Sequence, residues 1–320
     1  MFTRSAFRAF LIRLAAVVVG LSLGVFLYQC GNSRSSFDGG RAWEFLTMQT
    51  DLGPRYPESP GWQAFQDKMK AFLDSLGAVY QRQEFVYADS LSGDSVPMAN
   101  WIIRFNPDSA GKILIGAHCD TRPRADKEPD STRRGEPILG ANDGASGVAV
   151  IMLLAEMLKK HPPAVGVDLV LFDGEDFWQR GRMDQYFLGS TYFAANTPDT
   201  YWYGVVIDMI GDRDLQIYRE SLSEEYIKEI NDLVWAAARR LELPHVYDSV
   251  GHRVGDDHVA LANNGIPAVV VIDFDYPYWH TLADAPDKCS PESLALVGRW
   301  MLELIYTASN PWPDSVGQSE

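Results

Sequence analysis

The stretch GANDGASGVAVIMLLAEMLKKHPPAVGVDLVLFDGED, residues 140–176, decides the fold class of this 320-residue chain. Within it, residues 145–160 carry apolar side chains at helical spacing, and residues 167–172 form a short, nearly continuous apolar run. A run of this length is typical of a central strand that is covered on both faces. The order of glycine-rich turn, helix, strand and acidic turn therefore predicts one unit of an α/β fold.

Strand-like and helix-like segments also alternate on both sides of this stretch. The further strand-like segments are residues 79–87, 100–105, 112–117, 205–210, 215–218 and 268–272. Further helical spacing occupies residues 43–48, 62–76, 222–241 and 291–308. This alternation predicts a three-layer α/β/α sandwich with a largely parallel, mixed central sheet.

Composition excludes several classes of protein. With 46% hydrophobic and 22% charged residues, the chain has the balance of an ordinary globular protein rather than of a disordered or multi-span membrane protein. The formal net charge is −15, and there is no long run of Lys or Arg. Such a chain would repel a phosphate backbone, so nucleic acid is not an expected partner.

The amino terminus departs from this average. Three arginines precede the uncharged apolar run of residues 14–28, and Cys30 and the polar residues 31–36 follow. This is the layout of a bacterial export signal, and the run is shorter than the roughly 20 residues of a spanning helix. We expect cleavage before Cys30 and lipidation of its thiol; the alternative is an uncleaved signal anchor. Either outcome places the protein at a membrane, facing the periplasm or the cell exterior.

The rest of the chain is expected to form one large domain. Residues 1–36 would be the signal and tether, residues 37–310 the folded domain, and residues 311–320 a polar tail. An oxidising compartment would permit a disulfide between Cys119 and Cys289, but nothing in the sequence shows that the two residues meet.

Histidine and acidic residues recur where the predicted strands end. In parallel sheets, functional sites collect at the carboxyl ends of the strands, so these side chains should converge. The residues concerned are His118, Asp120, Asp143, Glu175, Asp176, Asp208, Asp257 and His280. Each alone has an ordinary explanation, such as a helix cap for Asp143 or a hydrogen-bonded loop histidine for His280. Taken together, they favour a metal site.

The residue types indicate which metal chemistry to expect. Zinc accepts imidazole nitrogen and carboxylate oxygen, and a catalytic zinc site keeps three protein ligands and one open position. Asp143, Asp176 and His280 would supply the three ligands. Glu175 would point beside the metal, because neighbouring side chains in extended backbone diverge, and a carboxylate so placed transfers protons.

The order and wording of the motifs resemble those of the zinc aminopeptidase and glutaminyl cyclase superfamily. The matching segments are GPRYPESPG (53–61), GAHCDT (116–121), GANDGASG (140–147), GED (174–176), IDMIG (207–211), GDDH (255–258) and WHT (279–281). Within the superfamily, the chain is most similar to bacterial relatives of the animal glutaminyl-peptide cyclotransferases. The resemblance covers residues 53–306, nearly the whole expected domain.

The resemblance implies roles for individual residues. It implies Asp143, Asp176 and His280 as zinc ligands and Glu175 as the acid/base residue, in agreement with the chemistry above. Residues 37–310 would then be a zinc-dependent catalytic domain. It also implies that Asp208 and Asp257 form a hydrogen-bonded acidic network with Glu175. Trp279 would wall the substrate pocket; Trp178 either does the same or simply packs under a loop. Animal cyclases mostly have glutamate where this chain has Asp176, and aspartate still offers a ligand oxygen.

Two reactions fit this resemblance. A cyclase would hold one zinc ion and convert the amino-terminal glutamine of peptides or proteins to pyroglutamate, releasing ammonia. An aminopeptidase would hold two, with His118 and Asp208 as added ligands and Asp143 as the bridge. The residues of the motifs ILGANDGASG, GDDH and WHT resemble those of the cyclases more than those of the peptidases, which favours the cyclase. A third alternative, a surface lipoprotein that only binds peptides, would be expected to have lost a ligand or the base, and none is missing.

Overall fold

The computed structural model describes residues 36–89, 91, 93–177, 182 and 185–312. The chain divides into the units Met1–Phe37 and Asp38–Glu320, and every helix and strand of the described residues lies in the second. The predicted export signal and Cys30 therefore fall outside the described residues. Among the residues described, no helix is long and apolar enough to cross a membrane.

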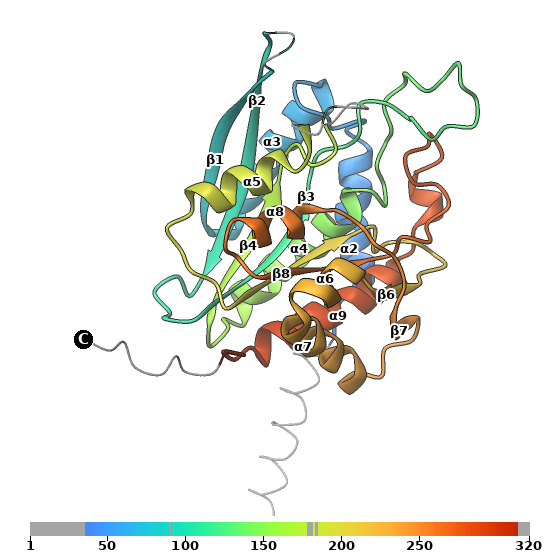
Figure 1. The fold of residues 1–320 in the computed structure, drawn as a ribbon. Coiled ribbons are helices and arrows are strands. Elements are labelled where there is room, and N and C mark those ends of the chain that lie inside the picture. Colours follow the sequence, from blue (N-terminus) through green and yellow to red (C-terminus); the bar gives the residue numbers. More distant parts are fainter. Residues whose placement is uncertain (1–35, 90, 92, 178–181, 183–184, 313–320) are drawn as a thin grey trace, which may run out of the picture. The chain divides into compact units, whose positions relative to one another are not determined.

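A six-stranded sheet forms the centre of this unit (Figure 1), with the strand order β1-β2-β4-β3-β5-β8. The strands are β1 (Val79–Ala88), β2 (Ser95–Phe105), β3 (Lys112–His118), β4 (Gly166–Phe172), β5 (Tyr203–Asp208) and β8 (Ala268–Ile272). β4, β3, β5 and β8 run parallel, whereas β2 is antiparallel to both β1 and β4. The predicted mixed, largely parallel sheet is confirmed.

Helices cover both faces of the sheet. α4 (Ala145–Lys160) contacts β3 and β4 and packs with α2 (Gly39–Thr50) and α9 (Pro291–Tyr306). α5 (Leu188–Asn196) contacts β1, β2 and β4, and it packs with α8 (Asp257–Asn263), which contacts β5 and β8. The four parallel strands are almost entirely buried, as their continuous apolar runs require.

Local sequence explains where several helices begin and end. α3 (Pro60–Leu76) starts with a hydrogen bond from the backbone N–H of Trp62 to the side chain of Ser59, and Pro60 occupies the first turn. It ends at Gly77, which has the left-handed backbone (φ 59°) that glycine adopts without strain. The predicted helix at 145–160 and strand at 268–272 have the bounds that the sequence indicated.

Two predictions about secondary structure were wrong. Residues 215–218 were expected to continue the series of strands, but β6 (Ile217–Arg219) pairs with β7 (Val246–Val250) in a separate two-stranded sheet. The helix expected at 222–241 is two helices, α6 (Ser221–Tyr226) and α7 (Lys228–Arg240). The break occurs at Ile227, whose backbone (φ −140°, ψ 48°) is not helical.

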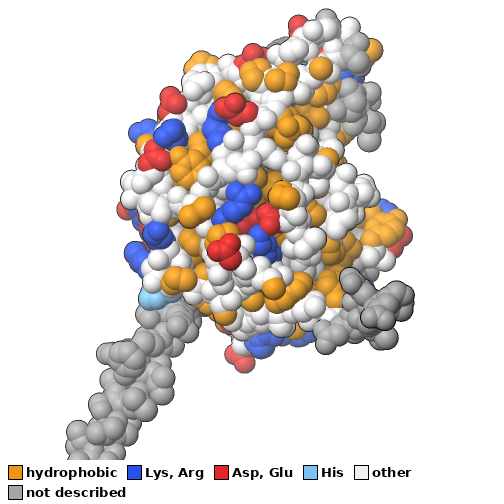
Figure 2. Space-filling view, turned by 90° about the vertical axis from the view of Figure 1, so that its left-hand side faces the viewer, with side chains coloured by type: hydrophobic (Ala, Val, Ile, Leu, Met, Phe, Trp, Pro, Cys, Tyr) orange, Lys and Arg blue, Asp and Glu red, His pale blue; other side chains and the backbone are white. Residues whose placement is uncertain are grey.

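Cys119 and Cys289 are both buried and both free, so they do not form the disulfide that the sequence left open. On the face drawn in Figure 2, the coloured basic and acidic side chains lie intermixed among hydrophobic ones. No patch of a single charge spreads across the described residues of that face.

Candidate functional site

The predicted site residues meet at one edge of the central sheet. His118 is the last residue of β3, and Asp208 is the last residue of β5. Glu175 and Asp176 follow β4, and His280 lies in the segment after β8. Because β3, β4, β5 and β8 are parallel, their carboxyl ends lie at the same edge.

Two groups of buried side chains at this edge could each hold a metal ion. The first consists of Asp143, Asp176 and His280, and the second of His118, Asp143 and Asp208. Within each group the potential ligand atoms lie within 4.8 Å of one another. Asp143 belongs to both groups, so its carboxylate lies between the two positions.

In the first group, Nε2 of His280 faces both carboxylates, 3.5 Å from Oδ1 of Asp176 and 3.7 Å from Oδ2 of Asp143. Burial and the nearby Asp176 raise the pKa of Asp143 to about 7. Burial opposes ionisation of Asp176 as well, but the charges of Arg122 and His280 outweigh it and lower the pKa of Asp176 to about 2. Asp176 is thus kept in the charged form that binds metals.

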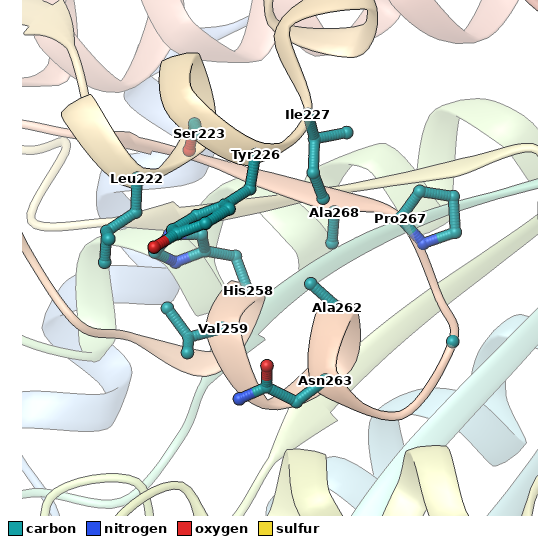
Figure 3. Close-up of a pocket in the computed structure, with 11 residues that line it drawn as sticks. Leu222, Ser223, Tyr226, Ile227, His258, Val259, Ala262, Asn263, Pro267 and Ala268 are labelled. Atoms are coloured by element: carbon teal, nitrogen blue, oxygen red, sulfur yellow. The ribbon is translucent and has the colours of Figure 1, made fainter.

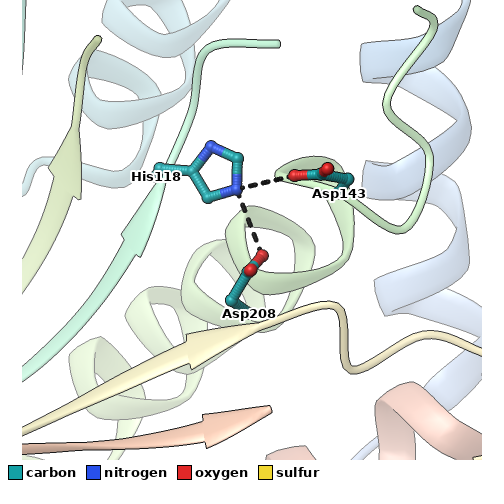
Figure 4. Close-up of side chains that lie close together, drawn as sticks. All are labelled: His118, Asp143 and Asp208. Carbon is teal, nitrogen blue, oxygen red and sulfur yellow. Dashed lines mark hydrogen bonds and ion pairs between the residues drawn. The ribbon is translucent and has the colours of Figure 1, made fainter. Parts of the chain in front are cut away.

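In the second group, Nε2 of His118 lies 3.1 Å from Oδ1 of Asp208 and 3.2 Å from Oδ1 of Asp143. Dashed lines mark both contacts in Figure 4. Burial lowers the pKa of His118, but Asp208 and its other acidic neighbours raise it well above the usual value. The same oxygen of Asp208 accepts a hydrogen bond from the backbone N–H of Met209.

The donor set fits a metal ion in the first group. Oδ2 of Asp143 and Oδ2 of Asp176 are buried and have no hydrogen-bond partner. A buried charged oxygen without a partner is costly, and a bound cation offsets that cost. Two carboxylates and one imidazole are ligands that zinc accepts, and three protein ligands leave a position open for water or substrate.

The loop that carries Asp143 is fixed by two buried side chains. The carboxylate of Asp284 accepts hydrogen bonds from the backbone N–H groups of Asn142 and Asp143. The fully buried guanidinium of Arg55 donates to the carbonyl oxygens of Leu139 and Gly140. Asp143 is therefore held by its backbone and does not act as a hydrogen-bonding cap of α4.

The backbone is also unusual around the site. His280 (φ 58°), Met209 (φ 47°) and Phe187 (φ 52°) have left-handed backbone, which is uncommon for residues other than glycine. All three residues line one cavity. Strained backbone of this kind persists where the surrounding structure enforces it, and it is frequent at functional sites.

This cavity has a volume of about 230 Å³ and combines acidic and aromatic side chains. Its acidic wall contains Asp143, Glu175, Asp176, Asp208 and Asp256, and its aromatic wall contains Tyr186, Phe187, Phe274 and Trp279. Trp279 thus lies where a pocket wall was expected. Trp178 lies outside the described residues, so its predicted place in the pocket stays a prediction.

Glu175 lines the cavity beside the first metal group. Burial, together with the charges of Asp176, Asp256 and Asp257, raises the pKa of Glu175 well above its usual value. Its backbone N–H and that of Asp176 donate to the two carboxylate oxygens of Asp120, which fixes the turn after β4.

The expected acidic network of Glu175, Asp208 and Asp257 stays a prediction. Oδ1 of Asp257 accepts a 2.5 Å hydrogen bond from Oγ of Ser190, and Asp256 lines the cavity. Asp256 also begins α8, because its side chain accepts a hydrogen bond from the backbone N–H of Asp257.

Sequence reasoning missed two residues next to the first metal group, Arg122 and Asp126. Arg122 donates a 2.5 Å hydrogen bond to Oδ1 of Asp176, and Oδ1 of Asp126 lies 3.2 Å from Nδ1 of His280. Both belong to RPRAD, residues 122–126, directly after the GAHCDT motif. The sequence signal available was an arginine and an aspartate four residues apart beside that motif.

A second cavity, of about 630 Å³, contains none of the predicted site residues. It lies between α6, α8 and the turn before β8, and Figure 3 shows the side chains around it. Most of them are apolar: Leu222, Tyr226, Ile227, Val259, Ala262, Pro267 and Ala268. Its buried histidine, His258, follows Asp257, and burial lowers the pKa of His258.

Known proteins resemble this chain over most of its length. A family model described as Peptidase family M28 matches residues 100–305. A glutaminyl-peptide cyclotransferase of Bothrops jararaca is 27% identical over 278 residues, which cover 74% of this chain and 73% of the relative.

Two solved structures share the fold and nearly their whole length with this chain. A glutaminyl cyclase of Tannerella forsythia has a TM-score of 0.81 and 31% identity, with 86% of this chain and 100% of that chain covered. A leucine aminopeptidase precursor of Bacteroides thetaiotaomicron has a TM-score of 0.81 and 30% identity, with 86% of this chain and 98% of that chain covered.

Proposed function

The chain belongs to peptidase family M28, and from that premise we propose that it is a zinc-dependent glutaminyl-peptide cyclotransferase. It would convert the amino-terminal glutamine of peptides or proteins to pyroglutamate and release ammonia. The observation that carries the proposal is Glu175 beside Asp143, Asp176 and His280 in a small cavity, in a chain that resembles glutaminyl cyclases over nearly their whole length.

Asp143, Asp176 and His280 would hold a single zinc ion. When bound there, zinc would polarise the side-chain amide carbonyl of the substrate glutamine. A pair of carboxylates and one imidazole leave the open position that this requires. Asp208 is already engaged by His118 and by the backbone N–H of Met209, which favours one ion over two.

Glu175 would move the proton. In the reaction, the neutral α-amine of the glutamine attacks its own side-chain amide carbon, a nitrogen–carbon bond forms, and the bond to the amide nitrogen breaks. Glu175 would accept the proton that the amine loses and return it to the departing nitrogen, which leaves as ammonia. The raised pKa of Glu175 makes its carboxylate a stronger proton acceptor than an ordinary glutamate.

The cavity would select the first residue of the peptide. Its volume of about 230 Å³ is below the roughly 300–1,000 Å³ of sites for drug-sized ligands, so it suits a single residue. Trp279 and Phe274, whose ring centroids are 4.9 Å apart, would form an apolar wall that keeps the glutamine side chain folded toward its amine. A folded substrate brings the reacting atoms together, which favours an intramolecular attack.

A two-zinc aminopeptidase remains the second candidate, because one observation favours it. The two possible metal groups share Asp143, and this arrangement suits a bridging carboxylate between two ions. In that reaction, Glu175 would take a proton from water as the water attacks the first peptide carbonyl, and a free amino acid would leave.

Metal analysis together with a leucine anilide assay separates the two candidates. We expect about one zinc per chain and no measurable release from the anilide. Nearly two zinc ions per chain with rapid leucine release would replace the cyclase by the aminopeptidase.

The location of the enzyme is a further part of the proposal. The basic and apolar residues before Cys30 support export, lipidation and anchoring at a membrane, with the catalytic domain facing the periplasm or the cell exterior. Peptides with exposed amino-terminal glutamine in that compartment would be the substrates.

A further inference from the structure

We propose that Arg122 and Asp126 are positioning residues that set the affinity of the first metal group. Asp126 would orient His280, and Arg122 would orient Asp176. The two residues and the segment between them are called the brace below. The inference rests on the proposed metal centre and adds residues that lie outside its ligand set.

Each end of the brace contacts one side chain of the first metal group. Arg122, whose side chain is 1% exposed, donates to Oδ1 of Asp176 at 2.5 Å and, through Nε, to Oδ1 of Asp126 at 2.7 Å. The same oxygen of Asp126 lies 3.2 Å from Nδ1 of His280. One arginine and one aspartate therefore connect two of the three potential ligands.

The backbone of the brace is fixed as well. The N–H of Ala125 donates to the carbonyl of Glu136, and the N–H of Lys127, the next residue after the brace, donates to the carbonyl of His280. The backbone of His280, which has the unusual φ of 58°, is therefore held by the residue that follows the brace, while the carboxylate of Asp126 lies against its ring.

The contact with Asp126 selects the form of His280 that binds a metal. A carboxylate near Nδ1 favours the tautomer that carries its proton on Nδ1, so the lone pair is on Nε2. Nε2 is the atom that faces Asp143 and Asp176. The ligand atom therefore points toward the other two ligands before any metal arrives.

Arg122 has a matching effect on Asp176. It occupies Oδ1, while Oδ2 stays buried without a hydrogen-bond partner and so remains open to a metal. A planar guanidinium that binds two carboxylates fixes their relative positions better than a flexible ammonium would.

The second metal group lacks an arginine like that of the brace. Among the described residues, no arginine or lysine forms an ion pair with Asp143 or Asp208. Nδ1 of His118 lies 3.6 Å from Asp120, whose carboxylate already accepts the backbone N–H groups of Glu175 and Asp176. Loss of the brace should therefore weaken one metal position and spare the other.

The affinity of the protein for zinc tests the brace. It is measured on the purified full-length chain by competition with a chromophoric chelator. Asp126→Asn keeps the shape of the side chain and removes its charge, and we expect it to weaken zinc binding roughly 10–100-fold. Arg122→Met should weaken it at least as much, and Arg122→Lys should give an intermediate loss. The melting temperature of the zinc-free Asp126→Asn protein should match that of the zinc-free wild type.

Two exposed residues of the same loop provide matched controls. The side chain of Asp130 accepts hydrogen bonds from Thr132, and the side chain of Arg133 pairs with Glu136. Asp130→Asn and Arg133→Met make the same chemical changes away from the ligands and should leave zinc affinity within about twofold of wild type. If Arg122→Met fails to fold, Asp126→Asn and Arg122→Lys still decide the question.

The outcomes separate this inference from the proposed function. Zinc affinity of Asp126→Asn equal to that of Asp130→Asn, in a wild-type protein that binds zinc and forms pyroglutamate, would overturn the brace alone. A wild-type protein that binds no zinc would overturn the proposed metal centre itself.

Discussion

Replacing Glu220 by Gln removes the charge of a buried carboxylate that joins α6 to the loop bordering the active-site cavity. Oε1 of Glu220 accepts the backbone N–H groups of Leu222 and Val254, and Oε2 accepts that of Ser223. Val254 belongs to the segment 253–256, which lines the cavity. Glutamine would direct an N–H group at one of these donors, so at least one hydrogen bond would be lost.

The size of the effect follows from the pKa of Glu220. Burial alone would raise it, but His258 and the three backbone N–H groups outweigh burial and lower it from 4.5 to about 2. That difference corresponds to about 3 kcal/mol of folding free energy at neutral pH, since one pKa unit is worth roughly 1.4 kcal/mol. Because the folded pKa is depressed, the stabilisation is complete above the unfolded pKa of 4.5 and is lost as the pH falls toward 2.

Urea unfolding of wild type and Glu220→Gln between pH 7 and pH 3 measures this contribution. We expect a difference in unfolding free energy of about 3 kcal/mol above pH 6 that shrinks to roughly half at pH 3. The exposed Glu229→Gln serves as the control and should change stability by no more than about 0.5 kcal/mol. A difference that does not vary with pH, or a Glu220→Gln protein as stable as the control, would refute the assigned role of this carboxylate.

Three further predictions concern the site and the anchor. Glu175→Gln should lower turnover roughly 10²–10⁴-fold while zinc content and melting temperature stay at wild-type values; activity within a few-fold of wild type would show that Glu175 is not the acid/base. Trp279→Ala should lower kcat/KM for glutamine-headed peptides at least roughly tenfold, since loss of about 1.4 kcal/mol of apolar contact has that effect, and an unchanged value would remove Trp279 from the pocket wall. Cys30→Ser should release the protein from membrane fractions or stall its processing; unchanged membrane association and mature mass would favour an uncleaved anchor.

Most of the central sheet could be predicted because its buried strands are short, continuous runs of apolar residues. β4 and β8 are buried on both faces, and a strand in that position must be apolar throughout. The small sheet of β6 and β7 carries no such signal. β7 is largely exposed, and its pairing with β6 joins segments nearly 30 residues apart, which no local pattern specifies.

The convergence of Asp143, Asp176 and His280 could also be predicted, because parallel strands end at one edge and each residue lies near such an end. The contacts of Arg122 and Asp126 could not. They lie in a loop, and their partners come from segments about 50 and 150 residues further along the chain. The position of Asp257 shows a similar limit: its hydrogen bond to Ser190 depends on how α8 packs against α5.

The product formed from a peptide with amino-terminal glutamine tests the central claim most directly. Mass spectrometry of the peptide after incubation with the purified enzyme should show the loss of one ammonia from an otherwise intact chain, and Glu175→Gln should abolish that change. Release of free glutamine, with the peptide shortened by one residue and no ammonia formed, would contradict the cyclase and establish the aminopeptidase.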